Sequence, residues 1–270
     1  MATELCSKLM KIENVGYTRK KQIIIEREIS DLIREQIRGY RKVGGNDDRN
    51  DIFAMLMNAI DEDGNMLEEE EIHDELITVL KAGFGTTANT LSWVFECLLS
   101  NPKALLAVKD QLDKVVGSDP ISKSHINKLT YISAVLKETL RLRPLTVMNG
   151  VRLVKETFKI GNYEIPPGVI LVNATYILHK REDVFENPEA FKPERFLDPK
   201  KKITPYMWAP FGGGLRMCAG RAFAMQEMSI VVATVLRMVH LEKAEPVTRA
   251  ERQGFFLSPE KGMLVNATKI

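Results

Sequence analysis

The sequence predicts a mainly α-helical protein that carries several small β-sheets. Long segments repeat apolar residues at the three- and four-residue spacing of a helix, and residues 151–172 read as a cluster of short strands. Residues 180–207 contain several prolines and show little periodicity, which predicts a long irregular loop. The helices are therefore expected to form the core, with the strands and the loop added to it.

The expected helices follow one another along most of the chain. In residues 20–42, Ile25, Ile29 and Ile33 fall on one face, with charged residues between them. Residues 70–100 form the longest helix, which ends before Pro102 because a residue that precedes proline disfavours the helical conformation. Further helices are expected at residues 51–60, 102–116, 124–143 and 221–238.

The expected strands are short and separated by turns. They cover residues 151–154, 158–160, 163–165 and 169–172, with turns at Gly161-Asn162 and Pro166-Pro167-Gly168. A terminal hairpin is expected over Gln253–Val265, and residues 1–19 are expected to be poorly ordered or atypical.

Composition excludes several classes of protein. The 270 residues are 44% apolar and 27% charged, with a net charge of +2, which argues against a partner recognised by bulk charge, nucleic acid in particular. Three cysteines form no paired motif, which favours a reducing compartment such as the cytoplasm. No signal peptide is apparent, and the most apolar window, residues 82–95, is too short to span a membrane.

The segment from Pro210 to Gly220 is the strongest candidate for a site. Four of the nine residues 212–220 are glycine, so the backbone can turn tightly and lie against something flat. Cys218 precedes the predicted helix 221–238, whose N-terminal partial charge stabilises a thiolate, and Arg216 adds a full positive charge. A thiolate for iron and a guanidinium for a propionate suit a haem.

Two more general interpretations also fit parts of this segment. A lone cysteine is usually a small buried hydrophobic residue, and a glycine-rich loop before a helix can bind phosphate. The composite Phe211-x-x-Gly214-x-Arg216-x-Cys218-x-Gly220 is more specific than either. It resembles the haem-binding signature of the cytochrome P450 family, the haem-thiolate monooxygenases.

The resemblance implies the family's fold and a haem b site. Cys218 is then the axial iron ligand, Phe211 packs beside the sulfur, and Arg216 and Arg152 bond the propionates. The glycines implied at the cofactor are Gly83, Gly212 and Gly220.

Two further motifs extend the resemblance. Glu138-x-x-Arg141 resembles the family's motif on its K helix, and Pro193-Glu194-Arg195-Phe196 resembles its PERF segment. The resemblance implies that Glu138, Arg141 and Arg195 form one buried network that holds the irregular loop. Burying three charges is tolerable only if all of them are paired, so their role is structural.

The middle of the predicted helix 70–100 is unusual, because two glycines and two threonines in residues 83–87 cost helical stability. This segment resembles the oxygen-binding groove of the family's I helix, and Thr86 matches its catalytic threonine. The resemblance places an apolar set on the substrate side, which fits a hydrophobic substrate: Ala82, Phe84, Thr87, Val147, Met148, Phe255 and Phe256.

The resemblance implies a monooxygenase that inserts one oxygen atom from O₂ into a small apolar substrate, with electrons from a separate reductase or ferredoxin. Gly85 departs from the family, because an acid usually precedes the threonine and helps deliver protons. Residues 1–270 match only part of the family fold, from about helix G or H to the C-terminal hairpin, so an N-terminally truncated domain is expected. Two alternatives remain open: a truncated non-catalytic relic, or a haem-thiolate enzyme using peroxide or rearrangement chemistry.

Overall fold

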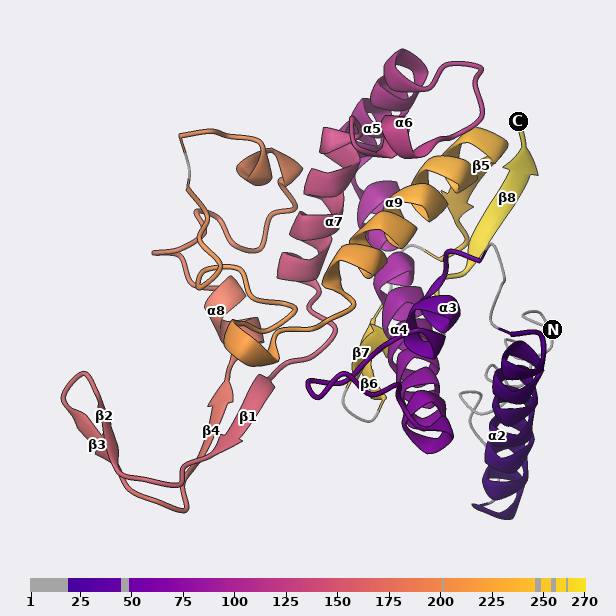
Figure 1. The fold of residues 1–270 in the computed structure, drawn as a ribbon. Helices are drawn as coiled ribbons and strands as arrows, with labels where there is room; N and C mark the ends of the chain where they lie inside the picture. The colour runs from indigo at the N-terminus through magenta and orange to yellow at the C-terminus, as the bar shows by residue number, and fades with distance from the viewer. Residues whose placement is uncertain (1–18, 45–48, 201, 246–248, 254–255, 261) are drawn as a thin grey trace. The chain divides into compact units, whose positions relative to one another are not determined.

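The computed structural model describes residues 19–44, 49–200, 202–245, 249–253, 256–260 and 262–270 (Figure 1). These residues form two compact units, residues 1–85 and residues 86–270, and each unit is described by itself. Helix α4, Glu69–Ser100, contributes residues to both units. The poorly ordered N-terminus expected at residues 1–19 lies outside the described residues except for Arg19.

The first unit is built from α2 (Arg19–Lys42), α3 (Ile52–Met57) and the beginning of α4. The predicted helix at residues 20–42 is confirmed, and the isoleucine face lies in the core. Asp51 caps α3, because its carboxylate accepts the Ala54 N–H at 2.9 Å. The core of this unit consists of Ile29, Ile33, Ile37, Tyr40, Met57, Ile72 and Leu76.

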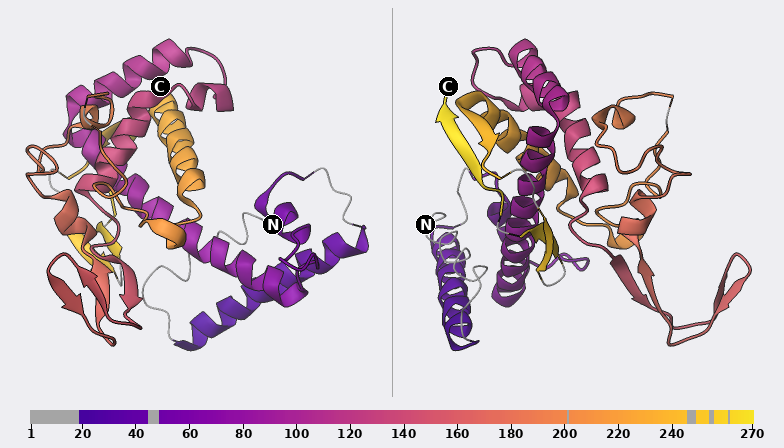
Figure 2. Two further views of the ribbon diagram at one scale, coloured as in Figure 1. Left: turned by 60° about the vertical axis from the view of Figure 1, so that its left-hand side comes forward. Right: turned by 180° about the vertical axis from the view of Figure 1, so that it is seen from behind.

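The second unit is mainly helical. It contains the rest of α4 together with α5 (Pro102–Val115), α6 (Lys123–Ile126), α7 (Thr130–Leu142), α8 (Thr175–His179) and α9 (Arg221–Met238). The single helix predicted over residues 124–143 is wrong, because a turn at residues 127–129 divides it into α6 and α7. Helices α7 and α9 lie side by side (Figure 2). Leu136 of α7 and Val232 of α9 are buried in the core.

Four two-stranded antiparallel sheets belong to the second unit. Strand β1 (Asn149–Leu153) pairs with β4 (Ile170–Asn173), and β2 (Phe158–Ile160) pairs with β3 (Tyr163–Ile165). The other pairs are β5 (Val239–Lys243) with β8 (Val265–Lys269) and β6 (Ala250–Gln253) with β7 (Phe256–Pro259).

The C-terminal hairpin differs from the prediction. The hairpin is β6–β7, and the following strand β8 returns to pair with β5, which directly continues α9. Sequence periodicity missed β5 because its five residues follow a long helix without a glycine or a proline.

The irregular segment predicted at residues 180–207 is confirmed in the described part of the chain, where its one regular element is a 3₁₀ turn, η1 (Pro193–Phe196). Among the described residues, no helix combines the length and the apolar character needed to cross a membrane.

Candidate functional site

The loop from Phe211 to Gly220 is closed by a main-chain hydrogen bond, in which Cys218 N–H donates to the Phe211 carbonyl at 3.0 Å. Gly212 and Gly214 have φ angles of +74° and +68°, a conformation that residues with a side chain rarely adopt. The short 3₁₀ turn η2 (Gly214–Arg216) completes the loop. Two of the loop glycines are therefore required by the backbone path itself.

The thiol of Cys218 is exposed, and the loop around it is open. A Cβ added at Gly213 or Gly214 would meet no atom within 4 Å. Cys97, the other described cysteine, is buried. Burial and the nearby Glu96 carboxylate raise the pKa of the Cys97 thiol to about 12. Of these two cysteines, Cys218 is therefore the one that can reach a ligand.

Cys218 lies just before the N-terminus of α9. Gly220 is the N-cap residue of that helix, and its carbonyl accepts the Ala224 N–H at 2.8 Å. An added Cβ on Gly220 would lie 3.8 Å from the Cys218 sulfur. The N-terminus of α9 therefore lies beside the sulfur, and its partial positive charge favours an anion there.

Aromatic packing supports the loop from its buried side. Phe211 is half-buried and meets Trp208 edge to face, with ring centroids 6.2 Å apart. Trp208 is in turn edge to face with Phe196 at 5.8 Å, and its indole N–H donates to the Lys137 carbonyl at 3.0 Å. These contacts connect the start of the cysteine loop to α7.

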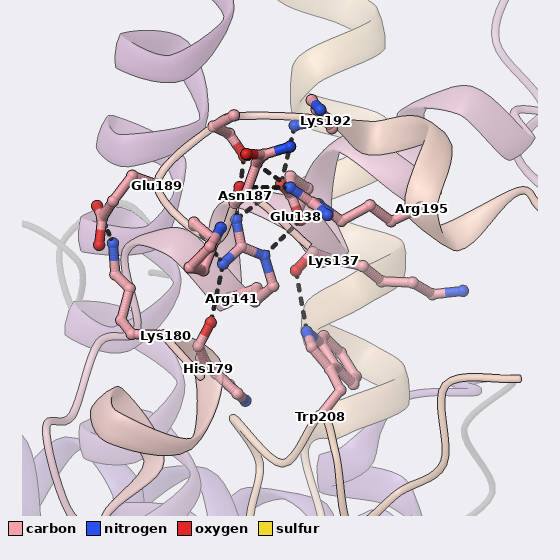
Figure 3. A network of polar contacts seen from close by, with 12 residues as sticks. Lys137, Glu138, Arg141, His179, Lys180, Asn187, Glu189, Lys192, Arg195 and Trp208 are labelled. Carbon is pink, nitrogen blue, oxygen red and sulfur yellow. Dashed lines mark hydrogen bonds and ion pairs between the residues drawn. The ribbon is translucent and has the colours of Figure 1, made fainter. Parts of the chain in front are cut away.

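A buried ionic network joins the same helix, α7, to the irregular segment that contains η1 (Figure 3). Glu138 accepts two bonds from the Arg141 guanidinium, at 2.7 and 2.8 Å, and one from Arg195 Nε at 3.2 Å. The Lys192 main-chain N–H donates to the same carboxylate at 2.8 Å. Glu138 and Arg141 have no exposed surface, and Arg195 is 8% exposed. The network predicted from the resemblance is confirmed.

The two arginines also hold the irregular loop through its main chain. Arg141 donates to the carbonyls of His179 and Pro188, at 2.9 and 2.7 Å. Arg195 donates to the Asn187 carbonyl at 2.8 Å and to the Glu186 carbonyl. Asn187 has a φ angle of +48°, which turns the loop sharply toward the arginines.

His179 is a residue of this network that sequence reasoning missed. Its side chain is completely buried, and its Nε2 accepts the Ala209 N–H at 3.2 Å. Burial first, and then the positive charge of Arg141, lower the pKa of His179 to about 4, so the ring is neutral at neutral pH. A histidine at the end of a five-residue helix gives no sequence signal that separates it from an exposed one.

Arg216 and Arg152, the predicted propionate partners, are both exposed in the second unit. Arg216 ends η2, within the cysteine loop. Arg152 lies in β1, and its guanidinium donates to the Val151 carbonyl at 2.8 Å. Both guanidinium groups therefore remain open to an anion, and their role toward a cofactor stays a prediction.

Three of the residues predicted to line a substrate, Val147, Met148 and Phe256, lie near one another in the second unit, where two segments pair. Val147 and Met148 are 37% and 57% exposed, and they follow Thr146, which forms an isolated bridge with Phe256. The neighbouring Leu257 N–H donates to the Leu145 carbonyl at 2.7 Å. Phe255, predicted to join them, lies outside the described residues.

The unusual segment of α4 remains helical throughout. Ala82 and Gly83 are exposed in the first unit, whereas Phe84 packs against the core of that unit. In the second unit Thr87 is buried, Thr86 is half-buried, and the Thr86 carbonyl accepts the Thr90 hydroxyl at 2.9 Å. Of these predicted residues, Ala82 and Gly83 are therefore exposed to solvent, whereas Phe84 and Thr87 pack against other parts of the protein.

The chain is thus a mainly helical protein that presents a thiol on an open glycine loop. It belongs to the cytochrome P450 family, whose family model matches residues 12–266.

Curated relatives support this assignment. "Putative cytochrome P450 135B1" of Mycobacterium tuberculosis (strain ATCC 25618 / H37Rv) is 40% identical over 193 residues, which are 72% of this chain and 39% of the relative. "Bifunctional cytochrome P450/NADPH--P450 reductase" of Fusarium oxysporum is 37% identical over 228 residues, covering 82% of this chain and 21% of the relative. The chain thus spans about two fifths or less of the length of these relatives.

The solved structure of the cytochrome P450DA heme domain has the same fold. It superposes with a TM-score of 0.86 at 24% identity, over 98% of this chain and 59% of that one. The predicted fold class, a partial cytochrome P450 fold of helices with small sheets, is therefore confirmed.

Family membership implies a haem with a cysteine thiolate ligand. The loop fits such a group in three respects. The sulfur is exposed, the glycine surface beside it has room for a flat ring, and the half-buried Phe211 offers an apolar contact.

Proposed function

We propose that this chain is the haem-binding part of a monooxygenase that inserts one oxygen atom from O₂ into a small hydrophobic substrate. The single observation that carries the proposal is the exposed Cys218 thiol on an open glycine loop, supported from behind by buried aromatic and ionic contacts. When bound, a haem b supplies the activation of O₂ and the transfer of an oxygen atom.

The residues of the loop would hold the cofactor. Cys218 would provide the thiolate to iron, and its negative charge is favoured by the start of α9. Gly212 and Gly220 would keep side chains away from the ring, and Phe211 would limit the access of water to the sulfur. Arg216 and Arg152 would each pair with a propionate.

Helix α4 would contribute Thr86, which belongs to the same unit as Cys218. The Thr86 hydroxyl would hold and orient a proton-donating water. Gly85, which precedes Thr86, is buried and carries neither a donor nor an acceptor on a side chain. This observation favours the second candidate function, a haem-thiolate enzyme that uses peroxide or rearranges its substrate.

The proposed substrate is apolar because the candidate lining residues are apolar. Val147 and Met148 expose apolar side chains and follow Thr146, which bridges to Phe256. We also propose that a separate reductase or ferredoxin supplies electrons. The Fusarium relative is named as a fusion with an NADPH–P450 reductase, which supports a reductase as the partner type.

The proposal is tested by the absorption spectrum of the reduced, carbon monoxide-bound protein. Wild type should show the band typical of a thiolate ligand, and Cys218→Ser should lose it. Cys97→Ala is the matched control, because that buried cysteine should leave the band unchanged. A wild type without bound haem would support the non-catalytic relic, and a Cys218→Ser protein with the thiolate band would refute the ligand assignment.

A further inference from the structure

His179 connects the buried ionic network with the segment that begins the cysteine loop. Its main-chain carbonyl accepts a bond from Arg141 Nη1 at 2.9 Å (Figure 3). Its ring Nε2 accepts the Ala209 N–H at 3.2 Å. We propose that His179 is a positioning residue, which holds Ala209 in place and thereby sets the position of the Cys218 sulfur. This proposal rests on the proposed function only in that the positioned sulfur is taken to bind haem iron.

The bond from Ala209 requires one protonation state of the ring. A main-chain N–H can only donate, so Nε2 must be unprotonated and the ring hydrogen must lie on Nδ1. Nδ1 is buried and makes no close hydrogen bond among the described residues, while the main chain of Arg141 and Leu140 interacts with the ring and partly opposes the lowering of its pKa. The positive charge of Arg141 and the complete burial of the ring both favour this neutral form.

Ala209 is well placed to transmit its position to the loop. Its carbonyl accepts the Gly212 N–H and the Asn149 side-chain amide, both at 3.1 Å. Two residues further along, the Phe211 carbonyl accepts the Cys218 N–H at 3.0 Å. A shift of Ala209 therefore disturbs the first turn of the loop and, through it, the bond that closes the loop at Cys218.

The acceptor atom of His179 can be separated experimentally from the packing of its ring. The ring lies edge to face with Phe185, with centroids 6.2 Å apart, so His179→Phe keeps an aromatic group and removes the acceptor. His179→Gln places an amide oxygen near the position of Nε2, whereas His179→Asn places it near Nδ1 and leaves Ala209 unpaired. Thr175→Val is the matched control. Thr175 is also completely buried on α8, and its hydroxyl has no hydrogen-bond partner in the part of the chain that the structure describes.

The first readout is hydrogen–deuterium exchange of residues 205–212 in the haem-free chain. A buried N–H left without an acceptor costs enough free energy to raise its exchange about tenfold. Exchange at Ala209 should rise by about this factor in the Asn and Phe variants and stay at the wild-type level in His179→Gln and Thr175→Val.

The second readout is the fraction of thiolate-type spectrum in the reduced, carbon monoxide-bound protein. The Asn and Phe variants should lose part of this fraction to a thiol-type spectrum, and His179→Gln should retain it. If wild type shows no thiolate spectrum, the proposed function fails, while the exchange data still decide the role of His179.

Wild-type exchange in the Asn and Phe variants would overturn the proposal, as would a Gln variant that behaves like Phe. If the Asn and Phe variants do not fold, a folded Gln variant with wild-type exchange supports the acceptor role, and an unfolded Gln variant overturns it.

Discussion

Replacing Glu138 by alanine should remove much of the stability of the second unit. The carboxylate accepts four hydrogen bonds, from Arg141 Nε and Nη2, Arg195 Nε and the Lys192 N–H, at 2.7 to 3.2 Å. Its loss leaves two buried guanidinium groups without their counter-charge, which costs about 3–5 kcal/mol when a buried pair is broken. Typical domains are stable by about 5–15 kcal/mol, so this change removes a large share of the total.

The matched control is Glu189→Gln, which removes a carboxylate from the same irregular loop. Glu189 pairs with Lys180 at 2.5 Å, but its side chain is 77% exposed, so the expected loss is about 1 kcal/mol or less. The measurement is urea unfolding followed by circular dichroism and by tryptophan fluorescence, because Trp208 contacts the same helix. Equal unfolding midpoints for the two variants would refute the argument that the buried charges depend on Glu138.

Three further predictions concern single residues of the second unit and of α4. Gly214→Ala should destabilise the protein by about 1 kcal/mol, because φ at this residue is +68°. The neighbouring Gly213 has a φ of −162°, so Gly213→Ala should leave the stability nearly unchanged. Thermal unfolding of the two variants measures the difference.

The free energy of unfolding should reach its full value above pH 6.5 and fall by up to about 3 kcal/mol toward pH 4. The reason is that the unfolded chain protonates His179 at its ordinary pKa, whereas the folded chain does so only at about 4. In urea unfolding at several pH values, His179→Gln should show a weaker dependence on pH. Gly85→Asp should increase the product formed per electron consumed if proton delivery limits the reaction. A positioned acid contributes about 10²–10⁴-fold to the rate of a step that needs a proton. No gain would favour peroxide or rearrangement chemistry.

The ionic network shows how far sequence reasoning reached. The spacing of Glu138 and Arg141 placed both on one helical face, and the resemblance added Arg195 from a distant segment. Spacing alone gave no reason to expect burial, because an i,i+3 ion pair on a surface has the same pattern. The resemblance supplied the third partner, and the structure then showed that all three are buried and bonded.

His179 and β5 show where sequence reasoning ended. Both depend on partners that are distant in the chain: Ala209 for His179, and Val265–Lys269 for β5. His179 accepts its bond from a main-chain N–H, a group that every residue except proline carries. No residue type at position 209 could therefore reveal the contact, and a five-residue strand after a helix has too little pattern to be distinguished from it.

The irregularity of residues 180–207 itself has a physical cause in the network. Glu138 supplies one negative charge, and Arg141 and Arg195 supply two positive charges, so the buried group has more donors than its carboxylate can accept. The remaining donors bond to main-chain carbonyls of His179, Glu186, Asn187, Pro188 and Ala190.

These carbonyls have to point at the guanidinium groups, a set of directions that the repeating geometry of a helix or a sheet does not provide, so this part of the chain is irregular. The same carbonyls fix the path of the chain from the end of α8 to Ala190. A substitution that restored helical periodicity to this segment would therefore weaken the network, and the loss of order would reach the cysteine loop through Ala209.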